Sequence, residues 1–105
     1  MNLKFSYLYR DAANYKNFNE VIFSNPNCRL AKEVESIIKK ALIGEAWFVA
    51  KEWSLPDTHF KEYSWDSELD HHWHEFELIE ESSEPVTENI SIEDFLYQIG
   101  KKDAE

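Results

Sequence analysis

The densest group of side chains able to bind a metal or move a proton is the DHHWHE segment, residues 70–75. If this segment is a strand, side-chain alternation places His72 and His74 on one face, so both imidazoles could reach a single Zn²⁺ ion. The spacing alone supplies no third ligand, for which the candidates are His59, Asp66 and Asp70. The alternative is a solvated loop and strand start whose histidines hydrogen-bond locally.

The same histidines could instead act as general acid and general base, because imidazole titrates near neutral pH. Arg10 or Lys16, both expected near the first hairpin loop, would then stabilise a phosphate, as in a metal-free ribonuclease. The acidic second half of the chain opposes this interpretation, since it repels an RNA backbone. The metal-binding and the acid–base interpretations together predict a metal-dependent or histidine-based hydrolase centred on residues 70–75.

Cys28 precedes a predicted helix, whose positive dipole end could activate a thiol as a nucleophile. A catalytic cysteine also needs a base and an oxyanion site, and the sequence locates neither. We therefore expect Cys28 to be a small buried packing residue. Because Cys28 is the only cysteine, the chain has no internal disulfide framework and no zinc site built on several thiolates. This cysteine content fits a reducing, cytoplasmic compartment.

A different chemistry is indicated by residues 45–84, where aromatic side chains are interleaved with carboxylates. Such a surface suits docking on a basic protein, because the rings supply buried area and the acids steer association. The residues predicted to form it are Trp53, Tyr63, Trp65, Asp66, Glu68, Asp70, Trp73 and Glu75. The alternative is that most of the rings fill the core while the acids keep the domain soluble.

The charge distribution favours a basic partner. The chain has 11 basic and 21 acidic residues and a formal net charge of −10. Residues 1–42 hold seven basic and four acidic residues, whereas residues 43–105 hold four basic and seventeen acidic ones. Direct binding to nucleic acid or to an anionic membrane is disfavoured, because affinity for phosphates depends on accumulated Lys and Arg. Whether the acidic half mimics a nucleic acid is left open.

The length and composition predict a single domain over residues 1–105. The chain is 43% hydrophobic and 15% aromatic, which is far from the composition of disordered proteins. No apolar run reaches the 18 or more residues of a membrane span. The two glycines cannot build a Gly-rich loop, and no nucleotide-binding motif occurs, so we predict no cofactor.

Hydrophobic periodicity predicts the elements that must position these side chains. Alternation predicts a strand over residues 3–10 that forms a hairpin with residues 18–23, and further strands over 46–53 and 73–80. Helical spacing predicts a helix over 30–42 with Asn27 as its N-cap, and a second over 92–99 opened by a capping box at Ser91 and Asp94. A short helix from Ser54 to Tyr63 is a further expectation.

These elements predict an α+β fold: a four-stranded, mainly antiparallel sheet with two amphipathic helices on one face, in the order β-β-α-β-β-α. The run YLYRDAANYKNFNEVIFSNP and the later WHEFE also resemble a small bacterial protein family of unknown function. That resemblance covers about the first quarter of the chain and one later segment, and it implies no activity, cofactor or catalytic residue.

The sequence therefore favours a small acidic intracellular module that binds a protein with a basic surface, as inhibitors, immunity proteins and antitoxins do. The alternative is the hydrolase centred on residues 70–75. The two differ in geometry, because an enzyme needs a concave pocket with converging polar groups, whereas a docking module can present a flat face. The oligomeric state is left open.

Overall fold

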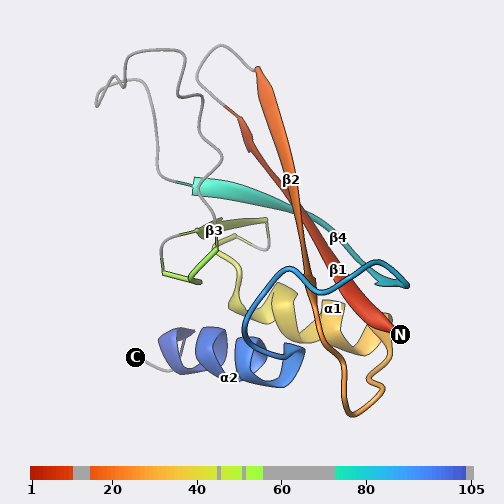
Figure 1. The fold of residues 1–105 in the computed structure, drawn as a ribbon. Coiled ribbons are helices and arrows are strands. Elements are labelled where there is room, and N and C mark those ends of the chain that lie inside the picture. Colours follow the sequence, from red (N-terminus) through yellow and green to blue (C-terminus); the bar gives the residue numbers. More distant parts are fainter. Residues whose placement is uncertain (11–14, 45, 51, 56–72, 104–105) are drawn as a thin grey trace.

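The computed structural model describes residues 1–10, 15–44, 46–50, 52–55 and 73–103. The elements in chain order are β1 (Asn2–Arg10), β2 (Lys16–Phe23), α1 (Ala31–Ala41), β3 (Trp47–Val49), β4 (Trp73–Ser82) and α2 (Ile92–Asp103). The strands form one antiparallel sheet in the spatial order β2-β1-β4-β3, and both helices lie on one side of it (Figure 1). The predicted α+β class and element order are confirmed. No helix in the described ranges is long and apolar enough to cross a membrane.

β1 is a central strand whose alternate side chains build the core. Leu3, Phe5 and Tyr7 are fully buried under the helices. On one side β1 pairs with β2, as the predicted hairpin requires, with Phe5 opposite Val21. On its other side it pairs with β4, with Phe5 opposite Ile79.

A β-bulge interrupts the alternation of β4. Tyr7 of β1 pairs with Phe76, but the preceding residue of β1, Ser6, pairs with Leu78, so Glu77 is an extra residue in β4. Such an insertion changes which face the following side chains occupy. As a result Phe76 and Ile79, three residues apart, both face the core, which strict alternation would forbid.

Each helix presents an apolar stripe to the sheet. Val34 and Ile38 of α1 are fully buried, and in α2 the buried stripe is Ile92, Phe95, Leu96 and Ile99. Ser91 Oγ accepts a hydrogen bond from the Asp94 amide at 3.3 Å, so the predicted cap of α2 forms. The Phe95 ring stacks on Phe23 at a centroid distance of 4.5 Å, which fixes α2 under β2.

The predicted cap of α1 is wrong. The N-cap is Leu30, which makes no side-chain capping bond, rather than Asn27. The preceding chain is instead closed by Asn25, whose side-chain amide donates to the carbonyl of Arg29 and accepts from its backbone amide, both at 3.0 Å. These two hydrogen bonds satisfy the polar groups of the loop before the helix. Leu30, at the end of this loop, is 65% exposed.

The predicted strand 46–53 is shorter in the structure. β3 ends at Val49 because the chain turns there: the Trp53 amide donates to the carbonyls of Val49 and Ala50 at 3.2 Å. Ser54 follows with a φ of 57°, and the Leu55 amide donates to the Ala50 carbonyl at 2.9 Å. The remainder of the helix predicted from Ser54 lies outside the described residues.

The Phe5 ring is the centre of the aromatic core. Its ring centroid lies between 5.4 and 6.4 Å from five other ring centroids, those of Tyr7, Phe48, Trp53, Phe76 and Phe95. These residues come from β1, β3, the turn after β3, β4 and α2. One side chain thus joins most of the elements of the fold.

Three ion pairs connect the loops to the elements around this core. Arg29 contacts Glu93 of α2 and Glu33 of α1, and Lys4 of β1 contacts Glu84. The hydrogen bond from Arg29 lowers the pKa of Glu93, and the hydrogen bond from Lys4 lowers that of Glu84, while Arg29 and Lys4 have raised pKa values for the same reason.

Replacing Phe5 with alanine should lower the free energy of unfolding by about 3–5 kcal/mol, because it removes a fully buried ring and leaves a cavity. Phe18→Ala is the matched control: this phenylalanine is 58% exposed on the neighbouring strand and should cost under about 1 kcal/mol. Urea unfolding of both variants in dilute solution measures the difference. Equal losses would contradict the central role of Phe5.

Replacing Glu93 with glutamine should destabilise the protein at neutral pH and have a diminishing effect in acid. The pKa of Glu93 is lowered in the folded state, so its contribution is present above the pKa of the unfolded chain and is lost as the pH falls through the folded value. The free energies of unfolding of the variant and the wild type should therefore converge at low pH.

Urea unfolding between about pH 7 and pH 2 measures this convergence. Glu81→Gln is the control, since Glu81 is exposed and has no ion pair among the described side chains. Its profile should follow that of the wild type. A constant gap between the Glu93→Gln and wild-type profiles would show that the ion pair is not the source of the effect.

Candidate functional site

The sheet has a second face, opposite to the helices. On β1 this open face carries the even-numbered residues Lys4, Ser6, Leu8 and Arg10. The segment after β4 covers its Lys4 end: the Asn2 side chain donates to the Glu84 carbonyl at 2.9 Å, and the Thr87 amide donates to the Ile22 carbonyl at 3.0 Å. Ile22 is consequently only 4% exposed. Toward the other end of this face Leu8 is also buried, at 7%, whereas Phe18 and Trp47 are exposed.

Strand register places one residue from each strand in a line across this part. Phe18 of β2 lies opposite Leu8, Leu8 lies opposite Glu75 of β4, and Glu75 lies opposite Trp47 of β3. Residues that oppose one another in an antiparallel pair share a face. We call this line the open-face row: Phe18, Leu8, Glu75 and Trp47.

A second tryptophan extends the row. Trp73 lies two residues before Glu75 on β4, so it shares the same face, and its ring stacks on Trp47 at 5.8 Å with an angle of 28° between the ring planes. The rings remain partly accessible, at 37% for Trp47 and 42% for Trp73. Two stacked indoles are therefore presented to solvent by two paired strands.

The charged member of the row, Glu75, forms an ion pair with Arg10. Arg10 Nε donates to Glu75 Oε2 at 2.8 Å, and a second guanidinium nitrogen lies 3.5 Å from Oε1. A two-point contact of this kind holds both side chains in place and balances the carboxylate charge. The centre of the row is thus a fixed ion pair, with apolar side chains on either side of it.

The structure separates the residues predicted to form a docking surface. Trp73 and Glu75 lie on the open face, as described above. Trp53 lies in the core: it is 4% exposed and stacks on Phe48 at 4.6 Å, so it contributes nothing to an exposed surface. The other predicted members lie outside the described residues: Tyr63, Trp65, Asp66, Glu68 and Asp70.

His74 lies on the core side of β4 and is 1% exposed. Its ring packs among those of Tyr7, Tyr9 and Phe48, at centroid distances between 5.3 and 5.9 Å. His72 lies outside the described residues, and within the described ranges no group of three His, Cys, Asp or Glu side chains is placed to hold a metal ion. The described part of the chain thus gives the hydrolase hypothesis no support, because a buried imidazole cannot reach a substrate.

The expectation that Cys28 is buried is wrong. Its side chain is exposed, its backbone has a φ of 52°, and its amide donates to the Asn25 carbonyl at 3.1 Å. The tight turn after Asn25 directs this residue to solvent. Since α1 begins only at Ala31, Cys28 does not lie at the helix N-terminus where the dipole would activate a thiol.

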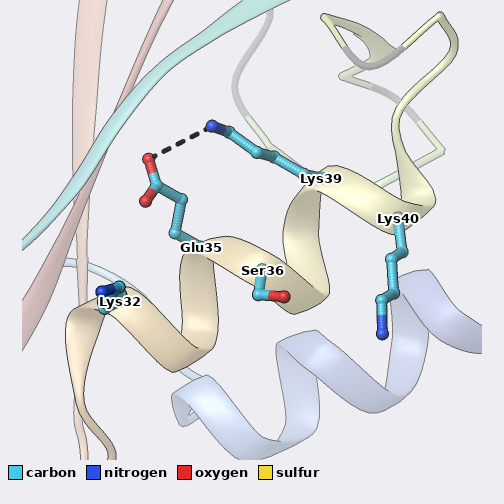
Figure 2. Close-up of a pocket in the computed structure, with 5 residues that line it drawn as sticks. All are labelled: Lys32, Glu35, Ser36, Lys39 and Lys40. Atoms are coloured by element: carbon cyan, nitrogen blue, oxygen red, sulfur yellow. Dashed lines mark ion pairs between the residues drawn. The ribbon is translucent and has the colours of Figure 1, made fainter.

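A shallow hollow of about 440 Å³ lies on the outer surface of α1 (Figure 2). All the lining residues come from that one helix: Lys32, Glu35, Ser36, Lys39 and Lys40. Its one ion pair among the drawn side chains joins Lys39 to Glu35 at 3.7 Å. A ligand site is expected to have an aromatic floor or converging catalytic groups, and the described lining residues supply neither.

The residues predicted to form the docking surface do not include Phe18 or Trp47, which are both exposed. Trp47 lies within the aromatic and acidic stretch 45–84 but is not among the residues selected from it. Phe18 could have been found as an exception to a pattern, because it stands between asparagines in a polar stretch. An apolar residue at a position that alternation assigns to solvent indicates an exposed apolar patch.

Comparison with protein-family models, with curated proteins and with solved structures found no match to this chain. The candidate site therefore rests on the geometry of the open face. The resemblance to a small bacterial protein family remains an expectation from the sequence.

The stacking of Trp47 on Trp73 should appear as a coupling energy in a double-mutant cycle. Urea unfolding of Trp47→Ala, Trp73→Ala and the double variant should give about 0.5–1.5 kcal/mol of coupling, as for other stacked aromatic pairs. Tyr97→Ala is the control partner, because Tyr97 is an exposed residue of α2. Its combination with Trp73→Ala should be additive within about 0.5 kcal/mol, and an equally additive tryptophan pair would contradict the stacking.

Proposed function

We propose that this protein is a binding module that docks on a partner protein with a basic surface through the open-face row and Trp73. The observation that supports the proposal most directly is the Trp47–Trp73 stack on the side of the sheet away from the helices. Tryptophan is among the residues most enriched at the energetic centres of protein interfaces. Two adjacent, partly exposed tryptophans form a candidate centre of this kind.

The row is also held rigidly, which favours binding. Its members are side chains of four hydrogen-bonded strands, and the Arg10–Glu75 contact fixes its middle. Side chains that are ordered before association lose less conformational entropy when the partner binds. The row follows the surface of a sheet rather than the wall of a pocket, as a docking module permits.

The charge of the chain supports the basic character of the partner. Arg10 balances the charge of Glu75, so the excess negative charge of the chain, −10 in total, lies on other carboxylates. These would attract a basic partner. Among those described on β4, Glu77, Glu80 and Glu81 are exposed. Charges at the margin of an apolar centre mainly accelerate association and select the partner.

An acidic single domain of this size suits an inhibitor, an immunity protein or an antitoxin-like protein. We place its action in the cytoplasm, since its one cysteine fits a reducing compartment. Direct binding to nucleic acid or to a membrane is not part of the proposal, because the same net charge opposes contact with phosphates.

The experiment places a photo-reactive amino acid at position 47 of the full chain inside the cells that produce it. Irradiation should join the protein to one basic partner, whereas the same group at position 97 should not. Tyr97 is the matched control because it is an aromatic residue 75% exposed on α2, away from the sheet. Equal cross-linking at the two positions would contradict the proposed surface.

With the purified partner, Trp73→Ala should weaken binding at least tenfold, since an interface centre loses about 2 kcal/mol or more on truncation to alanine. Tyr97→Ala should leave the affinity unchanged. Raising the salt concentration should slow association because the charges act through steering. Binding that is insensitive to both Trp73→Ala and salt would contradict the proposed function.

A further inference from the structure

β2 is an edge strand, and the described residues cover its outer side only at one end. The Ile22 amide donates to Thr87 Oγ1 at 2.8 Å, and the Ile22 carbonyl accepts from Thr87 and Glu88. In an antiparallel strand, every second residue directs its backbone amide and carbonyl to the same side. Glu20, Phe18 and Lys16 therefore direct theirs outward as Ile22 does.

No other described residue pairs with this outer side of β2 between Lys16 and Glu20. An uncovered strand edge is a template for pairing with another strand. Proteins usually protect such an edge with charges that repel an approaching copy, or with a bulge or a proline. The charges here are of opposite sign: Lys16 lies at one end of the open stretch and Glu20 at the other. The Glu20 carboxylate also lies 3.9 Å from Lys4 Nζ, at the limit of an ion pair, and remains 54% exposed.

The spacing of these two charges is symmetric about Phe18. If a second copy pairs antiparallel with a two-fold axis at Phe18, Lys16 lies opposite Glu20 of the second copy, and Glu20 lies opposite Lys16 of the second copy. Directly opposed residues of an antiparallel pair share a face and lie close enough for an ion pair. Two charges of the same sign would repel an approaching copy at this edge. Lys16 and Glu20 instead form two attractive pairs with the second copy.

We propose that two copies of this chain associate through their β2 edges in this register and form one continuous eight-stranded sheet. Lys16, Phe18 and Glu20 of each copy donate and accept one backbone hydrogen bond apiece across the axis. The two Phe18 rings, each 58% exposed in the single chain, meet at the centre of the contact. This proposal does not depend on the proposed function.

The covered end of β2 selects the register. Moving the axis one pair toward Ile22 would place Lys16 of the second copy against Ile22, whose outward amide and carbonyl are already bonded to the segment at Thr87. The same shift would also place Glu20 opposite Phe18 and lose both ion pairs. Only the register centred on Phe18 pairs both charges and leaves the Thr87 contact intact.

The dimer would also join the two open faces. A two-fold axis perpendicular to the sheet at Phe18 places both open-face rows on the same side, so they meet end to end at the Phe18 rings. The contact area of one strand edge is small, and such contacts are typically weak and transient. We therefore expect association that depends on protein concentration and weakens with salt.

Sedimentation equilibrium of the full chain from about 1 µM to about 1 mM tests the proposal. The average mass should rise with concentration from that of one chain, 12.5 kDa, toward that of two. Lys16→Glu should weaken dimerisation at least tenfold, because each of its two pairs changes from attraction to repulsion. The double variant K16E/E20K should restore dimerisation, since it exchanges the charges and keeps the pairing.

Lys32→Glu is the control for net charge: it makes the same change on the exposed side of α1 and should leave dimerisation unchanged. At high protein concentration, hydrogen exchange of the Lys16, Phe18 and Glu20 amides should slow, and that of the exposed Asn27 amide should not. A wild type that stays monomeric over the whole range would overturn the proposal. So would equal effects of Lys16→Glu and Lys32→Glu, or a failure of the charge exchange to restore association.

Discussion

The packing around Phe5 is the constraint on which the rest of this structure depends. Its ring touches aromatic side chains from three strands, the turn after β3 and α2, so the elements must converge on one side of β1. Once the odd-numbered residues of β1 face the helices, its even-numbered residues must face the other way. The open face is thus a direct consequence of how the core is filled.

This division explains which parts of the fold could be predicted from the sequence. Alternation in β1 and the helical spacing of residues 30–42 and 92–99 are local patterns, and both predicted the correct elements. The predicted end of the second helix at Gly100 is wrong, because α2 continues through this residue to Asp103. The bulge at Glu77 is not a local pattern, because a single extra residue is recognised only against the partner strand. The early end of β3 was missed for a similar reason, since the bonds from Trp53 that turn the chain are made by its backbone.

The candidate site was harder to predict than the fold. Composition drew attention to aromatic and acidic residues, of which Trp73 and Glu75 lie on the open face. Trp53 has the same residue type as Trp73, and His74 is the sequence neighbour of both Trp73 and Glu75, yet Trp53 and His74 fill the core. Only their position relative to the other core rings decides this. The compensation of Glu75 by Arg10 joins residues distant in sequence, so no spacing rule could have shown that this carboxylate is already occupied.

The central position of β1 also has a consequence for synthesis of the chain. Its first neighbour, β2, follows it closely, but its second neighbour, β4, begins only at Trp73. At the usual pace of about 5–20 residues per second, the ribosome needs several seconds to deliver that strand. During this time the nascent hairpin presents one unsatisfied edge of β1 and the apolar face that contains Phe5, and such surfaces make an incompletely folded chain prone to aggregation.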